Sequence, residues 1–216
     1  MEQKKFAMEK HDLVQYWKAS GLVKDEQVID AFLSIPREDF IMKEYRHLAY
    51  ADHPLPTKQS QTISQPSTIM FMLDKLQIKP NHKILEIGTG TGYHAALMGY
   101  LASKGKVYTI EIIEELANEA KGRIKRLGLK NVEVMQGDGS IGLPNHAPFD
   151  RIIMVAAAPS ISPTLISQLK KGGILLAPVG KGSVQRMIKA KKINKGWKEE
   201  DLGAFAFVPL RGKEGF

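Results

Sequence analysis

The order of hydrophobic and polar positions along the chain predicts an α/β protein. Between residues 81 and 180, short apolar runs typical of strands buried on both faces alternate with longer segments that carry apolar residues at helical spacing. The predicted strands span residues 83–87, 107–111, 132–135, 150–155 and 174–179. Repeated alternation of strand and helix is typical of a twisted, mostly parallel sheet with helices on both faces.

Glycine and proline mark where the predicted helices end. Gly21 and Gly128 each follow a periodic segment, and Pro36 stops another. The predicted helices span residues 11–20, 24–33, 67–76, 93–103, 114–127 and 163–169. Residues 50–66 are rich in Pro, Ser, Thr and Gln and show little periodicity, so we expect an ordered loop that crosses a surface or an active site.

The end of the chain departs from the alternation of strand and helix. Residues 183–191 and 202–210 are predicted to be two strands around a Lys-rich turn at 194–196. Such a hairpin gives the parallel sheet an antiparallel edge. A length of 216 residues suits a single domain with modest additions at each end.

A glycine-rich stretch after the first predicted strand carries the most specific chemical signal. Gly88, Gly90 and Gly92 form a G-x-G-x-G turn between a buried strand and a helix. Alternate glycines let the backbone approach a ligand where a Cβ would collide, and the helix that follows directs its first amides at that ligand. The dinucleotide pattern G-x-G-x-x-G needs glycine at position 93, where this chain has Tyr93.

Two acidic side chains indicate the kind of ligand. Glu86 precedes the turn, where it would repel a pyrophosphate and attract a cation. S-adenosylmethionine (SAM) has no phosphate and carries a sulfonium and an ammonium. Glu111 ends the next strand, where a carboxylate can accept hydrogen bonds from both ribose hydroxyls. The pattern therefore indicates an adenosyl site, with a dinucleotide site or a vestigial site as alternatives.

Composition excludes several kinds of chemistry. The absence of cysteine excludes disulfides, thiolate nucleophiles and Cys-ligated metals. His146 and Asp150 are four residues apart, but Pro148 between them prevents the helical spacing of a metal pair, so we expect no metal. No apolar run approaches the length of a membrane span, and no hydrophobic segment follows the basic start. We expect a cytoplasmic protein without a membrane partner.

The net charge of +8 and the pI near 9.5 permit attraction to nucleic acids or acidic peptides. The basic residues are spread through the chain, with a local concentration in residues 181–198, which we interpret as the solvated face of the hairpin. No run of interleaved aromatic and basic residues suggests a stacking platform for bases. We therefore expect no obligate nucleic-acid partner. We also expect a monomer.

Several local runs of sequence coincide with one enzyme family. The most specific is Gln61-Thr62-Ile63-Ser64-Gln65-Pro66. The others span residues 31–38, 52–56, 84–93, 107–111, 137–144, 147–150, 156–159, 168–173, 207–210 and 212–215. In these runs, and in their order, nearly the whole chain resembles the protein-L-isoaspartate O-methyltransferases.

This resemblance implies a Rossmann-like class I SAM-dependent methyltransferase that repairs proteins by methylating the free α-carboxylate of L-isoaspartyl residues. Ser64 would orient that carboxylate, and Val208 would meet the peptide. Glu111 would hold the ribose, and Asp138 with the Gly139 amide the adenine edge. The implied cofactor-binding residues are Gln61, Thr62, Ile63, Glu86, Gly88, Gly90, Glu111, Asp138 and Gly139.

The same resemblance divides the single domain into three parts. Residues 1–80 would form a helical extension with the substrate loop, residues 81–180 the SAM-binding core, and residues 181–216 the closing strands and segment. From the residues alone, Ser64 could instead cap the helix that begins near Pro66. Asp138 could form an Asx turn, and this turn is compatible with a role at the adenine edge.

The chain also departs from the family at a few positions. Residue 60 is Ser where members usually have glycine, and Lys58 and Gln59 are also unusual, so we expect the loop backbone to take another path or a narrower range of φ. Ser67 and His94 are further departures.

The implied chemistry suits a chain without a conspicuous catalytic base. The attacking carboxylate has a pKa of about 3.5 and is already ionised at neutral pH, so no general base is required. Two alternatives remain open at this point: an RNA methyltransferase of the same fold, which the basic charge allows, and a SAM-binding module without turnover.

Overall fold

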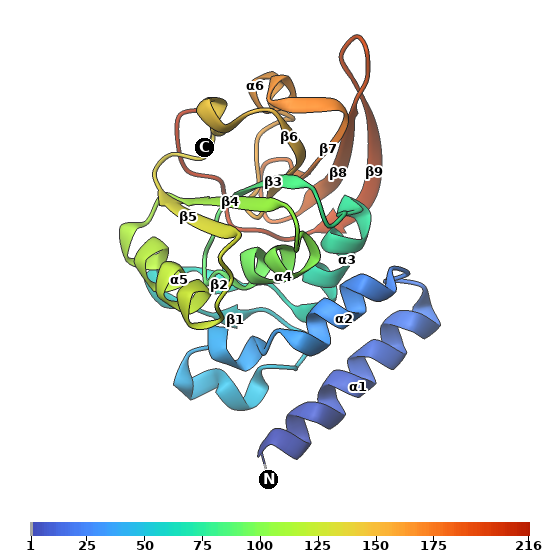
Figure 1. Cartoon of the computed structure of the whole chain (residues 1–216), viewed down its shortest axis with the longest axis vertical. Helices are drawn as coiled ribbons and strands as arrows, with labels where there is room; N and C mark the ends of the chain where they lie inside the picture. The colour runs from blue at the N-terminus through green and yellow to red at the C-terminus, as the bar shows by residue number, and fades with distance from the viewer. Residues whose placement is uncertain (1) are drawn as a thin grey trace.

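The computed structural model describes residues 2–216 and is built around one seven-stranded sheet (Figure 1). Its strands are β3 (Lys83–Ile87), β4 (Lys106–Glu111), β5 (Val132–Gln136), β6 (Phe149–Met154), β7 (Leu169–Val179), β8 (Gln185–Lys192) and β9 (Trp197–Phe205). They lie in the order β5-β4-β3-β6-β7-β8-β9. The first five of these are parallel to one another, whereas β7 pairs antiparallel with β8, and β8 pairs antiparallel with β9. The predicted parallel sheet with an antiparallel edge is confirmed.

Helices cover both faces of this sheet, as predicted. They are α1 (Glu2–Ser20), α2 (Glu26–Ser34), α3 (Pro66–Leu76), α4 (Tyr93–Leu101), α5 (Glu114–Arg126) and α6 (Pro163–Ser167). Because successive strand residues point to opposite faces, Ile84 packs in the core that holds α2, α3 and α4, while Leu85 packs in the core that holds α6. Figure 1 shows α6 across the sheet from α3, α4 and α5.

The first helix is longer than predicted. It begins at Glu2 rather than at residue 11, because Phe6 is buried and packs edge-on against the Tyr50 ring, with ring centroids 5.4 Å apart. Trp17 continues the same buried face against Phe32, with ring centroids 4.7 Å apart. Only four residues of α1 are buried, so its apolar period is too sparse to reveal the first turns.

Two boundaries near the C-terminus differ from the prediction because residues beside the predicted strands form hydrogen bonds with the sheet or with the segment after β6. α6 ends at Ser167 and β7 begins at Leu169, since the Phe149 amide donates to the Gln168 carbonyl at 2.8 Å. The last strand is Trp197–Phe205 rather than residues 202–210. Residues 206–210 leave the hairpin because the Leu210 amide donates to the Ala157 carbonyl, also at 2.8 Å, beyond the end of β6.

The predicted loop is ordered and contains a small hairpin. Strands β1 (Leu55–Pro56) and β2 (Thr62–Ile63) pair antiparallel around the 3-10 turn η3 (Lys58–Ser60). Other 3-10 turns are η1 (Arg37–Phe40), η2 (Lys43–Leu48) and η4 (Pro144–His146). Across residues 2–216, none of the helices combines the length and the apolar character needed to cross a membrane.

Candidate active site

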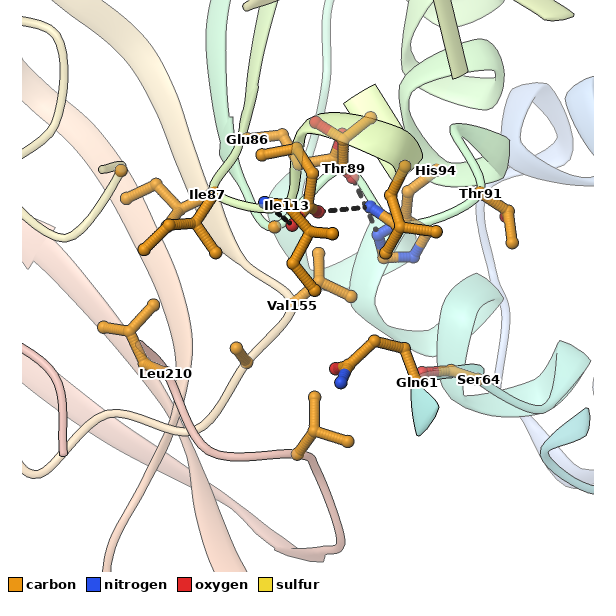
Figure 2. Close-up of a pocket in the computed structure, with 18 of the residues that line it drawn as sticks. Gln61, Ser64, Glu86, Ile87, Thr89, Thr91, His94, Ile113, Val155 and Leu210 are labelled. Atoms are coloured by element: carbon orange, nitrogen blue, oxygen red, sulfur yellow. Dashed lines mark hydrogen bonds and ion pairs between the residues drawn. The ribbon is translucent and has the colours of Figure 1, made fainter. Parts of the chain in front are cut away.

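A pocket lies where the chain changes direction across the sheet. In the sheet, β4 and β5 lie on one side of β3, and β6 to β9 lie on its other side. Such a switch point leaves a crevice at the carboxyl ends of the strands. The glycine-rich turn, the ends of β4 and β6, residues 61–64 and residues 208–211 line this pocket (Figure 2).

The structure brings together nearly all of the residues that the sequence predicted for the site. The predicted residues that line the pocket are Gln61, Thr62, Ile63, Ser64, Glu86, Gly88, Gly90, Glu111, Gly139 and Val208. Asp138 lies outside this lining. The individual role of each residue toward a ligand stays a prediction.

Two glycines near the pocket, one in its lining and one at the start of α4, leave little room for a side chain. Gly92 caps α4 with a φ of +87°, and a Cβ there would lie 3.1 Å from the Cβ of Ala120. At Gly139 a Cβ would lie 2.6 Å from the Cγ2 of Ile110. Both positions bring the backbone close to neighbouring parts of the protein, Gly92 to Ala120 of α5 and Gly139 to Ile110 of β4, and glycine is the residue that permits this approach.

Glu86 is fully buried at the end of β3. Its Oε2 accepts a hydrogen bond of 2.5 Å from the Thr109 hydroxyl, which lies 2.6 Å from the Thr89 hydroxyl. Its Oε1 faces His94 Nδ1 at 3.6 Å. Burial raises the pKa of Glu86, and the nearby His94 and Thr109 act in the opposite direction. Glu86 is therefore a buried carboxyl in the lining of the pocket.

Glu111 links the glycine-rich turn to the start of α5. Its Oε2 accepts from the Gly90 amide at 2.8 Å, and its Oε1 accepts from the Ile113 amide at 3.0 Å. A carboxylate has about four lone-pair directions, so both oxygens keep capacity for further donors such as ribose hydroxyls. These amides also fix the carboxylate in place, which the sequence pattern alone did not predict.

Asp138 joins the pocket to the C-terminal segment instead of lining it. Its Oδ1 accepts from the Ser140 amide, forming the Asx turn that was the alternative interpretation, and its Oδ2 accepts from the Lys213 amide, each at 2.8 Å. Partial burial would raise the pKa of Asp138, but the Lys213 and Ser140 donors outweigh it and hold the pKa below its usual value. Its carboxylate positions the Gly139 segment.

Arg37 is a residue that sequence reasoning missed, although it lies in one of the runs that carry the family resemblance. It is fully buried, and its guanidinium donates to the Ala49 carbonyl and the Ser64 carbonyl, both at 2.8 Å. Burial lowers the pKa of Arg37 to about 10. It therefore fixes the backbone of the residue predicted to orient the substrate. Its place in that run was the only signal for it in the sequence.

A second hollow adjoins the pocket. It is lined by Pro54, Thr62, Ser64, Gln65, Thr68, Val155, Ala206, Phe207 and Val208. Thr62, Ser64, Val155 and Val208 line both the pocket and this hollow. Ser64 and Val208, which the sequence predicted to meet the substrate, thus lie between the two spaces.

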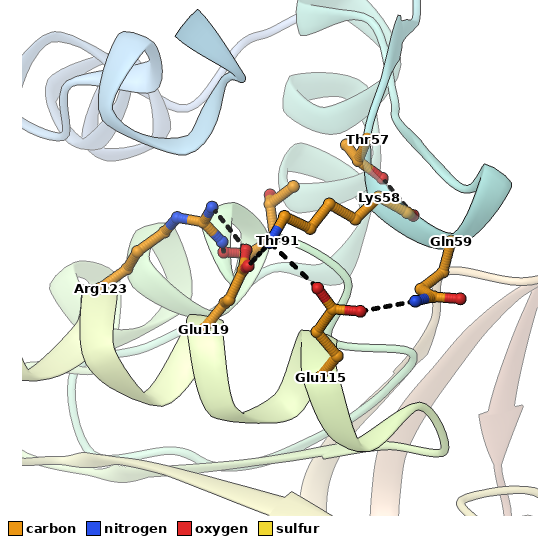
Figure 3. A network of polar contacts seen from close by, with 7 residues as sticks. All are labelled: Thr57, Lys58, Gln59, Thr91, Glu115, Glu119 and Arg123. Atoms are coloured by element: carbon orange, nitrogen blue, oxygen red, sulfur yellow. Dashed lines mark hydrogen bonds and ion pairs between the residues drawn. The ribbon is translucent and has the colours of Figure 1, made fainter.

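Two of the three unusual residues, Lys58 and Gln59, attach the loop to α5 (Figure 3). Lys58 Nζ lies 3.0 Å from Glu115 Oε1 and 2.5 Å from Glu119 Oε1, and the Gln59 amide donates to Glu115 at 2.5 Å. These carboxylates raise the pKa of Lys58. Gln59 and Ser60 have φ values of +57° and +55°, so Ser60 occupies the left-handed region that glycine reaches without strain.

Within residues 2–216, no group of three or more His, Asp or Glu side chains is arranged to hold a metal ion. The polar groups that line the pocket include the carboxylates of Glu86 and Glu111, the hydroxyl of Ser64 and the imidazole of His94.

Solved structures place the fold among the class I SAM-dependent methyltransferases. A protein-L-isoaspartate O-methyltransferase superposes with a TM-score of 0.86 at 30% identity, covering 95% of this chain and 67% of the other. A β-aspartate methyltransferase from Plasmodium falciparum, in complex with S-adenosyl-L-homocysteine, superposes with a TM-score of 0.81 at 23% identity, covering 93% and 97% of the two chains. The second match supports the fold alone.

The sequence comparison narrows this class to one family. The family of protein-L-isoaspartate(D-aspartate) O-methyltransferases matches residues 8–215. Proteins called protein-L-isoaspartate O-methyltransferase are 44% identical in Ignicoccus hospitalis, over 95% of this chain and 98% of theirs, and 43% identical in Dictyoglomus turgidum, over 98% and 95%. The chain belongs to the protein-L-isoaspartate(D-aspartate) O-methyltransferase family.

Proposed function

We propose that this protein transfers a methyl group from SAM to the free α-carboxylate of L-isoaspartyl residues in damaged proteins and peptides. Family membership supports the reaction. The observation that carries it in this chain is that Ser64 and Val208 line both the pocket and the adjoining hollow. A peptide in the hollow would present its carboxylate to the same hydroxyl that borders the cofactor.

The pocket fits SAM on one structural observation. Glu86 Oε1 is buried and has no hydrogen-bond partner within residues 2–216, so an anionic acceptor is available for the cationic end of the cofactor. In this proposal Gln61, Thr62 and Ile63 cover the cofactor, and Glu86, Gly88 and Gly90 border its methionine part. Glu111 holds the ribose, and Asp138 positions the Gly139 amide at the adenine edge.

The reaction needs positioning more than acid–base chemistry. When bound, SAM supplies an electrophilic methyl group on its sulfonium. The substrate carboxylate is ionised at neutral pH, with a pKa of about 3.5, and attacks directly. Ser64 donates a hydrogen bond to one carboxylate oxygen and leaves the other free to meet the methyl carbon, so Ser64 is not a nucleophile. The two charges cancel during transfer, and exclusion of water by residues 61–64 therefore favours the reaction.

The proposal is tested with methyl-labelled SAM and two matched peptides, one with L-isoaspartate and one with aspartate. We expect base-labile methyl ester only in the isoaspartyl peptide. Ser64→Ala should lower turnover about 10- to 100-fold, the range for losing one donor to a charged group, and change S-adenosylhomocysteine affinity less than about twofold. Ser167→Ala, on the exposed face of α6, is the matched control.

The alternatives predict different outcomes. Methylation of tRNA without methylation of the isoaspartyl peptide would favour an RNA methyltransferase. Tight cofactor binding with no ester on any isoaspartyl peptide would favour a binding module. Neither alternative gains support from the family assignment. A metal-free, monomeric enzyme in the cytoplasm, formed as one domain from residues 1–80, 81–180 and 181–216, belongs to the same proposal and stays a prediction.

A further inference from the structure

His94 is a buried polar residue to which the reaction above assigns no role. It lies in the first turn of α4, is 5% exposed and lines the pocket beside Glu86 (Figure 2). Within residues 2–216, neither of its ring nitrogens has a hydrogen-bond partner, and the same is true of Glu86 Oε1. The other oxygen, Glu86 Oε2, is satisfied by Thr109.

These unpartnered atoms are unusual because a buried polar atom without a partner costs about 1–3 kcal/mol. The separation of 3.6 Å between His94 Nδ1 and Glu86 Oε1 is too long for a hydrogen bond. The two side chains therefore lie side by side in one cavity without satisfying each other. Unsatisfied donors and acceptors that converge on a cavity indicate a site built for a ligand with both kinds of group.

The surroundings of the two side chains differ in charge. His94 lies at the N-terminal end of α4, where the helix dipole and free amides favour an anion, and the capping residue Gly92 has no side chain to occupy them. Glu86 favours a cation. An α-amino acid, with a carboxylate and an ammonium on one carbon, complements this pair of neighbouring sites.

We propose that His94 is a cofactor-binding residue, whose imidazole N–H donates to the carboxylate at the amino-acid end of the cofactor while Glu86 holds the ammonium. This inference rests on the proposed function. It makes His94 a determinant of specificity for ligands that keep the complete amino-acid end over those that lack the carboxylate.

The test uses three ligands that differ only at that end: S-adenosylhomocysteine, its analogue without the carboxylate, and 5′-methylthioadenosine, which lacks the whole amino-acid end. Affinities are measured by calorimetry, without turnover. His94→Leu should weaken S-adenosylhomocysteine about tenfold or more, because a hydrogen bond to a charged group is lost, and change the other two less than about twofold.

Two further variants distinguish the contribution of Glu86 to ligand binding from that of His94. Glu86→Gln should weaken both S-adenosylhomocysteine and the analogue without the carboxylate, and leave 5′-methylthioadenosine nearly unchanged. His94→Asn retains an N–H donor and should recover part of the loss seen with His94→Leu. Thermal unfolding of each variant shows whether it is folded.

Equal weakening of all three ligands by His94→Leu, in a variant that unfolds at the wild-type temperature, would overturn the inference, because it would mean that His94 only shapes the pocket. Unchanged binding of all three would overturn it as well. If the wild-type protein bound none of the three ligands, the proposed function itself would fail, and this result is distinguishable from the other two.

Discussion

The two walls of the cofactor pocket are held in different ways. The glycine wall, residues 86–92 with Glu111, is formed by the ends of adjacent parallel strands and the turn between β3 and α4. The Gly88 amide donates to the Ile110 carbonyl at 2.9 Å, and the Gly90 amide donates to Glu111. Backbone groups and one carboxylate therefore determine its shape.

The loop wall, residues 57–64, depends instead on side chains that reach it from distant parts of the chain. Arg37 donates to the Ser64 carbonyl from 27 positions away, and Lys58 meets Glu115 from 57 positions away. The Arg37 side chain is buried, whereas the Lys58–Glu115 ion pair is exposed. One pocket thus combines a wall fixed by the sheet with a wall held by single side chains from other parts of the chain.

The largest effect is expected from Arg37, because it is the buried support of the loop wall. Arg37→Met leaves the Ala49 and Ser64 carbonyls without a donor, and we expect unfolding free energy to fall by about 3 kcal/mol. Urea denaturation measures it. Arg37→Lys should recover little, because an ammonium cannot reproduce the planar fork. A variant as stable as the wild type would show that the loop wall is held elsewhere.

Substitution of Glu111 tests how much the glycine wall contributes to ligand binding. Glu111→Gln removes the charge that accepts from the Gly90 and Ile113 amides, and we expect S-adenosylhomocysteine affinity to fall about 10- to 100-fold. Calorimetry measures the change. Glu114→Gln, an exposed neighbour, is the control. Loss in both variants would mean that overall charge, rather than the position of Glu111, governs binding.

His82 allows the stability of the sheet to be changed without touching either wall. Its Nδ1 accepts from the Lys79 amide at 3.0 Å before β3, and burial together with nearby Arg151 lowers its pKa to about 4. The contribution of His82 is complete above pH 6.5, the ordinary pKa, and is lost as pH falls toward 4.

Unfolding free energy should therefore decrease by about 1 kcal/mol between pH 7 and 4.5 through this group, after allowance for screening by water. His82→Asn keeps an acceptor but does not titrate, so its stability curve should be flatter over this range. Exposed His47→Asn is the control. Parallel curves for wild type and His82→Asn would contradict the assignment.

The smallest effect is expected from Lys58, because its ion pairs are exposed. Lys58→Ala should accelerate cofactor release about twofold at low salt, and the difference from wild type should disappear at high salt. Stopped-flow release rates measure it. Lys106→Ala removes a similar exposed pair with Glu133, 3.1 Å long, at the other end of the sheet and should have no effect. A salt-independent difference would argue against an electrostatic attachment of the loop.

The residues predicted for the site lie together in one pocket where local sequence determines geometry. The positions of Glu86, Gly88 and Glu111 in the pocket follow from a strand, a turn and a second strand that are close in sequence. Asp138 was placed less well, because its Asx turn was recognisable but its bond to the Lys213 amide was not. A contact over 75 positions leaves no local pattern.

The sequence by itself determined the alternation of strands and helices, the glycine-rich turn and the acids beside it. These features depend on the period of apolar residues and on local backbone conformation, which are set by residues close in sequence. Only the tertiary structure decided that the chain leaves β9 at Phe205 to reach Ala157, that Arg37 supports Ser64, and that His94 lies unpartnered beside Glu86. These arrangements depend on which distant backbone and side-chain groups satisfy one another once the core is packed.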